Sequence, residues 1–161
     1  MPQSSSAYPV VFVSLMLAMV MRILPFPHEL SVYNPDWVLL CLIYWNMAIP
    51  ERVGVGTAWF AGLLADVLTG RLMGQHALIY SLTAYFCIRL HRRLRLYPLS
   101  QQAMTVLGLL LTGQVLMFWT QSVKAAANVD ARYWLPSLFG AILWPFLFVL
   151  LRRVRRYFNI F

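Results

Sequence analysis

Hydrophobic residues gather in six long runs along the chain, separated by short segments that are polar or rich in proline and glycine. Such runs predict membrane-spanning helices, because a helix of about 20 apolar residues crosses the hydrocarbon core of a bilayer. The predicted spans are residues 8–24, 35–49, 54–69, 76–90, 103–121 and 133–151. Together with their short connections they take up nearly all of the 161 residues, so the sequence predicts a single all-α transmembrane domain over residues 1–161, built as a six-helix bundle.

The second run, residues 35–49, is short for a membrane span. At 1.5 Å per residue its length is about 22 Å, against a hydrocarbon core of roughly 30 Å. Either flanking residues complete the crossing, or the bilayer thins here, or the helix is partly re-entrant. Asn34, Pro35 and Asp36 mark its start, with Asn34 as the expected cap and proline in the first turn.

The third run carries a stripe of small residues that includes one carboxylate. Positions four apart share a helix face, and here they are Gly54, Ala58, Gly62, Asp66 and Gly70. Small residues let another helix approach closely in lipid. A carboxylate deep in the membrane costs roughly 2.5–3.5 kcal/mol, so it should face protein or a wet cavity. We therefore expect Asp66 to point into the bundle, with Gln114 of the fifth run as a candidate partner.

Several roles remain open for this stripe. Asp66 either locks helices together or serves a cation, a proton or a ligand, and the stripe packs against a helix of this chain or of a partner. No other Asp, Glu, Lys or Arg lies well inside a run, which disfavours a pump. The three histidines lack the spacing of metal ligands, and no nucleophile or phosphate-binding motif is present. We expect no metal, no cofactor and no enzymatic activity.

Composition supports an integral membrane protein. The chain is 61% hydrophobic and 11% charged, whereas soluble domains average about 45–50% apolar and about 25% charged residues. The net charge of +8 comes largely from arginines that flank the apolar runs, which points to membrane orientation and not to nucleic acid. Cys41 and Cys87 lie inside runs, so we expect them to be buried thiols.

The arginines predict how the chain is oriented. Two clusters stand out: Arg89, Arg92, Arg93 and Arg95 after the fourth run, and Arg152, Arg153, Arg155 and Arg156 after the sixth. Two spans separate the clusters, so they should share one side with Arg52. The positive-inside rule makes that side cytoplasmic, with both termini, in the inner membrane. The clusters should also anchor anionic lipids. Arg22, Arg71, Lys124 and Arg132 are left for the other side.

Three stretches resemble the MreD family of rod-shape-determining proteins in its proteobacterial form. They are NPDWVLLCLIYW (34–45), IPERVGVGTAWFAGLLADVLTG (49–70) and GAILWPFLFVLLRRVRR (140–156). Positions that match the recurring family pattern are Asn34, Pro35, Trp37, Pro50, Arg52, Gly54, Gly62, Asp66 and Gly70. The resemblance implies no catalytic role for any of them.

The resemblance further implies a place in the machinery that elongates rod-shaped cells by lateral peptidoglycan synthesis. Its expected direct partner is MreC, with MreB, RodA and a class B penicillin-binding protein in the same complex. The family is also similar in architecture to the six-helix substrate-binding subunits of energy-coupling-factor vitamin transporters. We therefore expect a non-enzymatic membrane scaffold. The alternative is a subunit that binds or transports a small molecule or lipid, with a pocket near Asp66 lined by Trp59, Gln114 or Trp119.

Overall fold

A computed structural model describes residues 7–71, 73–123, 128 and 130–160. Over these residues the chain is all-helical and contains no strand, which confirms the predicted fold class at that level. The helices are α1 (Ala7–Ile23), α2 (His28–Ser31), α3 (Trp37–Ala48), α4 (Val55–Thr69), α5 (Gln75–Leu96), α6 (Leu99–Ser122) and α7 (Leu135–Tyr157), with a 3₁₀ helix, η1 (Ala131–Trp134), before α7.

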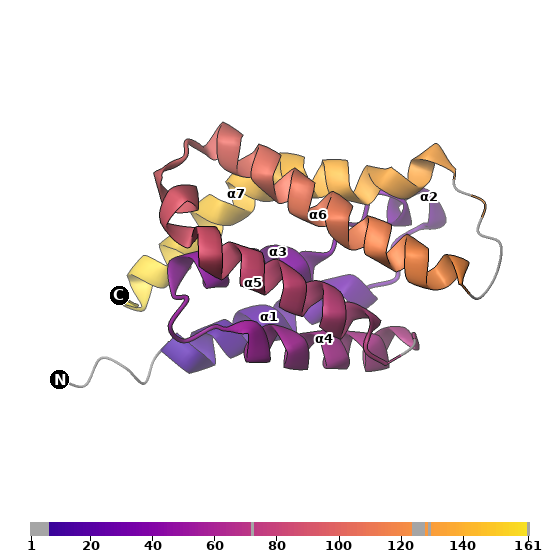
Figure 1. Ribbon diagram of the computed structural model, residues 1–161. Helices are drawn as coiled ribbons and strands as arrows, with labels where there is room; N and C mark the ends of the chain where they lie inside the picture. The colour runs from indigo at the N-terminus through magenta and orange to yellow at the C-terminus, as the bar shows by residue number, and fades with distance from the viewer. Residues whose placement is uncertain (1–6, 72, 124–127, 129, 161) are drawn as a thin grey trace.

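The long helices run roughly side by side, with α6 and α7 along one edge, α1 and α4 along the other, and α5 between them (Figure 1). Helix α3 is the centre of the bundle, since every residue from Val38 to Ala48 is buried. It contacts α1, α5 and α7, while α4 packs along α5 and α6 along α7. A short, wholly apolar helix suits this central position because protein covers all of its sides.

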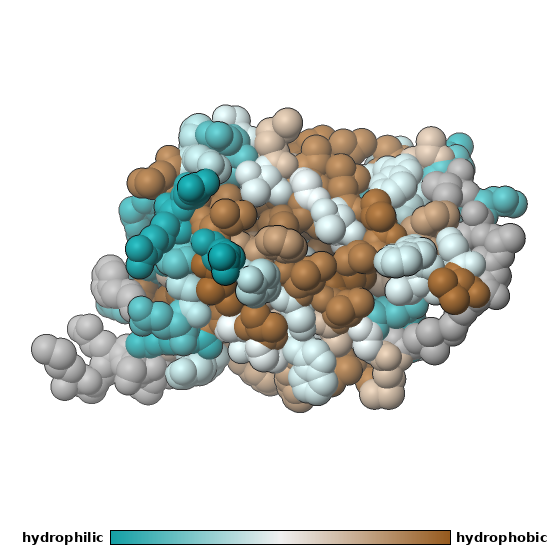
Figure 2. All heavy atoms as spheres, viewed as in Figure 1, coloured by the Kyte–Doolittle hydropathy of each residue, from teal (hydrophilic) through white to brown (hydrophobic). Residues whose placement is uncertain are grey.

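Apolar side chains cover much of the outer surface. Large exposed examples include Phe12 on α1, Phe60 on α4 and Phe146 on α7, and apolar residues dominate the middle of the face shown in Figure 2. Exposure on this scale fits a lipid environment better than water. Two segments, Leu99–Ser122 and Ala131–Tyr157, are long and apolar enough by themselves to cross a membrane. That all six predicted spans cross it remains a prediction.

The two arginine clusters lie at the same end of the bundle. The ends of α5 and α7 come together there, beside the start of α1 and the α3–α4 turn (Figure 1), and hydrophilic residues gather at that end (Figure 2). Helix α2, the α4–α5 turn and η1 lie at the opposite end. We call the first the arginine end. We call the second the cleft end, because a cleft opens between the helices there. Lys124, expected on the side opposite the arginine clusters, lies outside the described residues.

Several helices extend past the apolar runs. Helix α5 continues to Leu96, because Leu94 is buried and Arg95 donates hydrogen bonds to the carbonyls of Met47 and Ala48 at the end of α3. Helix α6 already begins at Leu99, directly after Pro98, and α7 continues to Tyr157.

The helix cap predicted for α3 is wrong by two residues. The cap is Asp36, whose carboxylate accepts a hydrogen bond from the backbone N–H of Leu39 at 3.2 Å. Asn34 instead accepts one from the indole N–H of Trp37 at 2.8 Å. Asp36 is better placed to cap because it directly precedes the first helical turn. A side chain at that position reaches the free backbone N–H two or three residues further along the chain.

Candidate functional site

The stripe of small residues on α4 faces α5 of the same chain. Ala58, Gly62 and Asp66 are buried. A Cβ atom added at Gly62 would lie 2.5 Å from the backbone nitrogen of Ala77 and 2.7 Å from the carbonyl carbon of His76. The two helix backbones are therefore in contact, and only glycine fits between them. The ends of the stripe lie outside this contact, because Gly54 precedes α4 and Gly70 ends it with a φ of +62°.

Asp66 lies in the last turn of α4, not at its middle, and its side chain is fully buried. One carboxylate oxygen accepts hydrogen bonds from the backbone N–H of His76 (3.0 Å) and from its ring nitrogen Nδ1 (2.6 Å). The other accepts one from the backbone N–H of Gly74 at 2.8 Å. These backbone groups belong to the start of α5, where N–H groups lack partners within the helix. Asp66 thus caps α5 from the neighbouring helix.

The imidazole of His76 connects Asp66 to an arginine. Its Nε2 atom lies 2.6 Å from Nη2 of Arg22 at the end of α1. A guanidinium donates hydrogen bonds and cannot accept them, so Nε2 is the acceptor and the ring proton sits on Nδ1. His76 is therefore neutral and donates that proton to the carboxylate of Asp66. Both ring nitrogens are occupied.

Arg22 also reaches the start of α3. Its Nη1 atom lies 2.7 Å from the Asp36 carboxylate and 3.0 Å from the hydroxyl of Tyr80, which donates to Asp36 at 2.8 Å. We call these five side chains the polar network: Arg22, Asp36, Asp66, His76 and Tyr80. The network joins α1, α4 and α5 to the cap of α3 at the cleft end. With neutral histidine it carries two carboxylates and one guanidinium.

A cleft of about 850 Å³ opens beside the network. Arg22, Asp36 and His76 form part of its wall, and Gln114 of α6 forms another part. The amide of Gln114 donates to the carbonyl of Tyr133 and accepts from the hydroxyl of Ser137. The cleft thus lies between the network and the start of α7.

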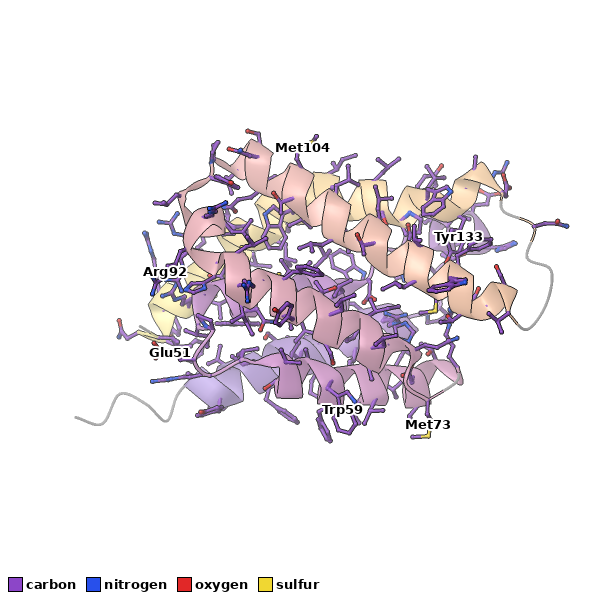
Figure 3. The ribbon with its side chains drawn as sticks, viewed as in Figure 1. Glu51, Trp59, Met73, Arg92, Met104 and Tyr133 are labelled. Atoms are coloured by element: carbon purple, nitrogen blue, oxygen red, sulfur yellow. The ribbon has the colours of Figure 1, made fainter. Side chains whose placement is uncertain are left out.

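The two tryptophans expected to line a pocket near Asp66 are not on the wall of this cleft. Trp59 is 51% exposed and Trp119 is 68% exposed, and Trp59 points away from the bundle (Figure 3). Trp59 lies seven residues before Asp66, but the inward face of α4 is taken by its small residues, which leaves the bulky ring on the outer face. Asp66 itself lies behind His76.

Comparison with known proteins decides the family. The family model described as rod shape-determining protein MreD matches residues 4–154. The chain belongs to the MreD family. A MreD relative from Haemophilus influenzae, described as rod shape-determining protein MreD, is 30% identical over 140 residues, which cover 87% of this chain and 86% of the relative. No solved structure matches the chain.

The positions that follow the MreD pattern divide between the two ends of the bundle. Asn34 and Pro35 line the cleft, and Trp37 begins α3 just beside it. Pro50 and Arg52 lie in the α3–α4 turn at the arginine end. The pattern therefore frames α3 at both of its ends, and Gly62 and Asp66 of the same pattern fix α4 against α5.

The eight arginines expected to anchor this MreD chain in lipid headgroups differ in their surroundings. Arg95 donates to the carbonyls of Met47 and Ala48 at the end of α3, Arg155 donates to the carbonyl of Ile160 at 3.0 Å, and Arg89 donates to the hydroxyl of Tyr85 at 3.3 Å. All eight except the half-buried Arg155 are exposed, so these hydrogen bonds leave seven arginines open to the surroundings: Arg89, Arg92, Arg93, Arg95, Arg152, Arg153 and Arg156. Figure 3 shows Arg92 and Glu51 at the arginine end.

The polar network went unnoticed in the sequence, except for Asp66. Arg22 and His76 stand at the ends of apolar runs, and no local pattern connects them. Topology was the available signal, because Arg22, Asp36 and His76 all fall on the side opposite the arginine clusters when the predicted spans are counted. Among the residues that the structure describes, no three His, Cys, Asp or Glu side chains gather as metal ligands.

Proposed function

We propose that this chain is a non-enzymatic scaffold of the cell-elongation machinery in the inner membrane, and that it binds MreC directly. Membership of the MreD family, whose description is rod shape-determining, supports a role in cell shape. MreB, RodA and a class B penicillin-binding protein belong to the same proposed complex, which would organise lateral peptidoglycan synthesis. Anionic lipids would bind the exposed arginines at the arginine end.

The observation that carries the scaffold proposal is the polar network. It fixes α1, α4 and α5 to the start of α3 through charged hydrogen bonds, which are stronger than neutral ones. A bundle held in this way presents its outer faces in a fixed arrangement to partner helices. The network offers little to catalysis, because both nitrogens of His76 are already bonded to Asp66 and Arg22.

The stripe on α4 supports locking of the bundle over docking of a partner helix. Gly62 already contacts the backbone of α5, so a second helix has no access to that face. A transmembrane helix of MreC would instead meet one of the exposed apolar faces. Large exposed side chains such as Phe60 and Phe146 are candidates for that contact, since aromatic residues are enriched at protein interfaces.

The cleft favours a second candidate function, a subunit that binds or transports a small molecule or lipid. Its wall contains Arg22 and His76, and Asp66 is one hydrogen bond behind His76. A volume of about 850 Å³ lies within the range of about 300–1,000 Å³ that is usual for ligand sites.

One experiment tests both candidates. The tagged chain is purified from its own membranes in a mild detergent, and mass spectrometry identifies the proteins and the small molecules that accompany it. The scaffold proposal expects MreC in near-stoichiometric amount. Recovery of the folded chain without any elongation protein, but with one enriched ligand, would reject the scaffold in favour of the binding subunit. The matched control is an unrelated inner-membrane protein carrying the same tag.

A further inference from the structure

A second cavity, which is apolar, lies between α5 and α6. Its volume is about 270 Å³, and its walls include Ile79, Phe86 and Leu90 of α5 and Leu109, Thr112 and Leu116 of α6. We call it the apolar groove. Phe86, Leu90 and Thr112 are exposed, so the groove opens on the outer surface of the bundle. In a bilayer it is reached from the lipid.

The apolar groove extends inward from the arginines at the end of α5. Its α5 wall reaches from Leu90 to Ile79, a rise of about 17 Å at 1.5 Å per residue. Half of a hydrocarbon core of roughly 30 Å is about 15 Å, so the groove is about as deep as one leaflet. Ile79 closes its inner end, because its Cγ2 methyl lies 3.0 Å from where a Cβ atom of Gly113 would be.

Arg93 stands at the mouth of the apolar groove. Residues three or four apart share a face of a helix, and Arg93 follows Leu90 of the groove wall by three positions. Arg89 flanks the same face one position before Leu90, and both arginines are exposed. Since a guanidinium binds phosphate through two parallel hydrogen bonds, a phosphate at this mouth would meet a suitable partner.

The arginine end carries a large excess of positive charge. The structure describes all five acidic residues of the chain, and of these only Glu51 lies at this end. Nine arginines lie there: Arg52, Arg89, Arg92, Arg93, Arg95, Arg152, Arg153, Arg155 and Arg156. Hydrophilic residues at this end border the apolar middle of the face shown in Figure 2. A molecule that spans this border needs an anionic head and an apolar tail.

We propose that Arg93 and the apolar groove form a binding site for an anionic phospholipid from the leaflet at the arginine end. The phosphate lies against Arg93, and one acyl chain lies between α5 and α6. A soluble anion would leave the groove unfilled, and a lipid without net charge would leave the excess of arginines unmatched. The site rests on the proposed contact of the exposed arginines with anionic lipids and names one position where both parts of the lipid are held.

The test uses native mass spectrometry on the full chain released from detergent micelles that contain a defined lipid. The probes are phosphatidylglycerol and phosphatidylcholine with identical acyl chains, and glycerol 3-phosphate as a soluble head group. We expect about fivefold more bound phosphatidylglycerol than phosphatidylcholine, equal to about 1 kcal/mol, and no retained glycerol 3-phosphate. Equal binding of the two lipids, or retention of glycerol 3-phosphate, would overturn the proposal.

Variants of Arg93 locate the head group. Arg93→Gln should remove most of the preference for phosphatidylglycerol, whereas Arg93→Lys, which keeps the charge, should retain it. The matched control is Arg153→Gln, because Arg153 is exposed at the same end but belongs to α7 and not to the helices that form the groove. Its loss should change the preference little.

A second pair of variants locates the acyl chain. Thr112→Trp, in the groove wall on α6, should reduce the binding of both lipids. Val115→Trp, on an exposed part of α6 outside that wall, should not. Unchanged lipid binding in Thr112→Trp, with helicity intact, contradicts the assignment. Loss of MreC in place of lipid from this variant would show that a partner helix occupies the groove, which also overturns it.

The outcomes separate this site from the function on which it rests. Equal effects of Arg93→Gln and Arg153→Gln would reject the site and leave a general contact of the arginines with anionic lipids. No effect of either variant, with equal binding of the two lipids, would reject both. Recovery of MreC from native membranes is measured separately, so the scaffold proposal stands or fails by itself.

Discussion

Asp66 shows how a carboxylate can be buried in this bundle without instability. Burying a charge is costly unless hydrogen bonds compensate it, and here each oxygen accepts a hydrogen bond from the start of α5. Its place in the last turn of α4 brings it to those N–H groups, which needed partners in any case. The carboxylate of Asp66 and the N–H groups at the start of α5 are hydrogen-bond partners of each other. Neither therefore needs water as a partner, and both can be covered by protein.

Replacement of Asp66 by asparagine should destabilise the protein. The amide nitrogen of the new side chain would face a backbone N–H, either of Gly74 or of His76, and two donors cannot bond each other. We expect the free energy of unfolding to fall by about 1–3 kcal/mol, the usual range for a buried polar group left unsatisfied. Unfolding by sodium dodecyl sulfate in mixed micelles, followed by circular dichroism, measures this.

The control for that measurement is Asp130→Asn. The side chain of Asp130 is 73% exposed, and its carboxylate comes no closer than 4.0 Å to Nε of Arg132. Loss of its charge should therefore change the free energy of unfolding by no more than about 0.5 kcal/mol. If the two variants were equally stable, the hydrogen bonds of Asp66 would not have the structural role described above.

At the residue scale, the sequence predicted that Asp66 points inward but not what it meets. The periodicity of α4 was enough for its direction, because small residues and the carboxylate share one face. Its partners come from other helices: Arg22 precedes it by 44 positions and lies on α1, while His76 follows it on α5. Contacts between helices of this kind have no local signature in a single sequence.

Helices α4 and α5 are the most closely packed pair of elements, and Gly62 is the position that allows it. Gly62→Ala would place a methyl group against the backbone of α5, which cannot rotate away as a side chain would. We expect a loss of about 1–3 kcal/mol in unfolding free energy, as found for overpacked cores. The same detergent titration measures it.

Gly56→Ala is the matched control on the same helix. A Cβ atom at Gly56 meets nothing within 4 Å, so alanine there should be neutral or should stabilise α4 by up to about 1 kcal/mol. Equal losses from Gly62→Ala and Gly56→Ala would mean that helix propensity, and not the contact with α5, is responsible.

At the element scale, the hydrophobic runs located the long helices but not their ends. Helix α5 continues past its apolar part because arginines on its last turns face solvent while Leu94 and Arg95 turn toward α3. An amphipathic end of this kind falls outside any rule based on continuous hydrophobicity. Helix α3 (Trp37–Ala48) lies within the predicted run of residues 35–49, which Pro35 and Pro50 delimit on both sides, but it is shorter than that run.

The whole molecule should be oriented with its arginine end in the cytoplasm. A cysteine at Met73, which is 74% exposed at the cleft end, should react with a membrane-impermeant thiol reagent added outside spheroplasts. A cysteine at Leu96, which is 85% exposed at the arginine end, should react only after the cells are lysed. Cys41 and Cys87 are buried, so they should contribute little background. The reverse pattern of labelling would invert the proposed topology.

At the scale of the molecule, counting spans placed the two arginine clusters on one side, and the bundle brings them to one end. The cleft was not foreseen in this form. Its walls come from all seven α-helices and from η1, and a pattern read along one chain gives no account of how so many segments enclose a space. Gln114 was predicted as a candidate partner of Asp66 because a polar residue inside an apolar run is visible without knowing its neighbours, but its amide bonds Tyr133 and Ser137 instead.

The mutual capping of Asp66 and the start of α5 has a consequence for how the chain enters the membrane. If α4 were inserted alone, its carboxylate would face lipid with no donor to meet it, at a cost of roughly 2.5–3.5 kcal/mol. The donors are only eight to ten residues further along the chain. We therefore expect α4 and α5 to leave the translocation machinery as a single helical hairpin, with the turn already closed around Asp66.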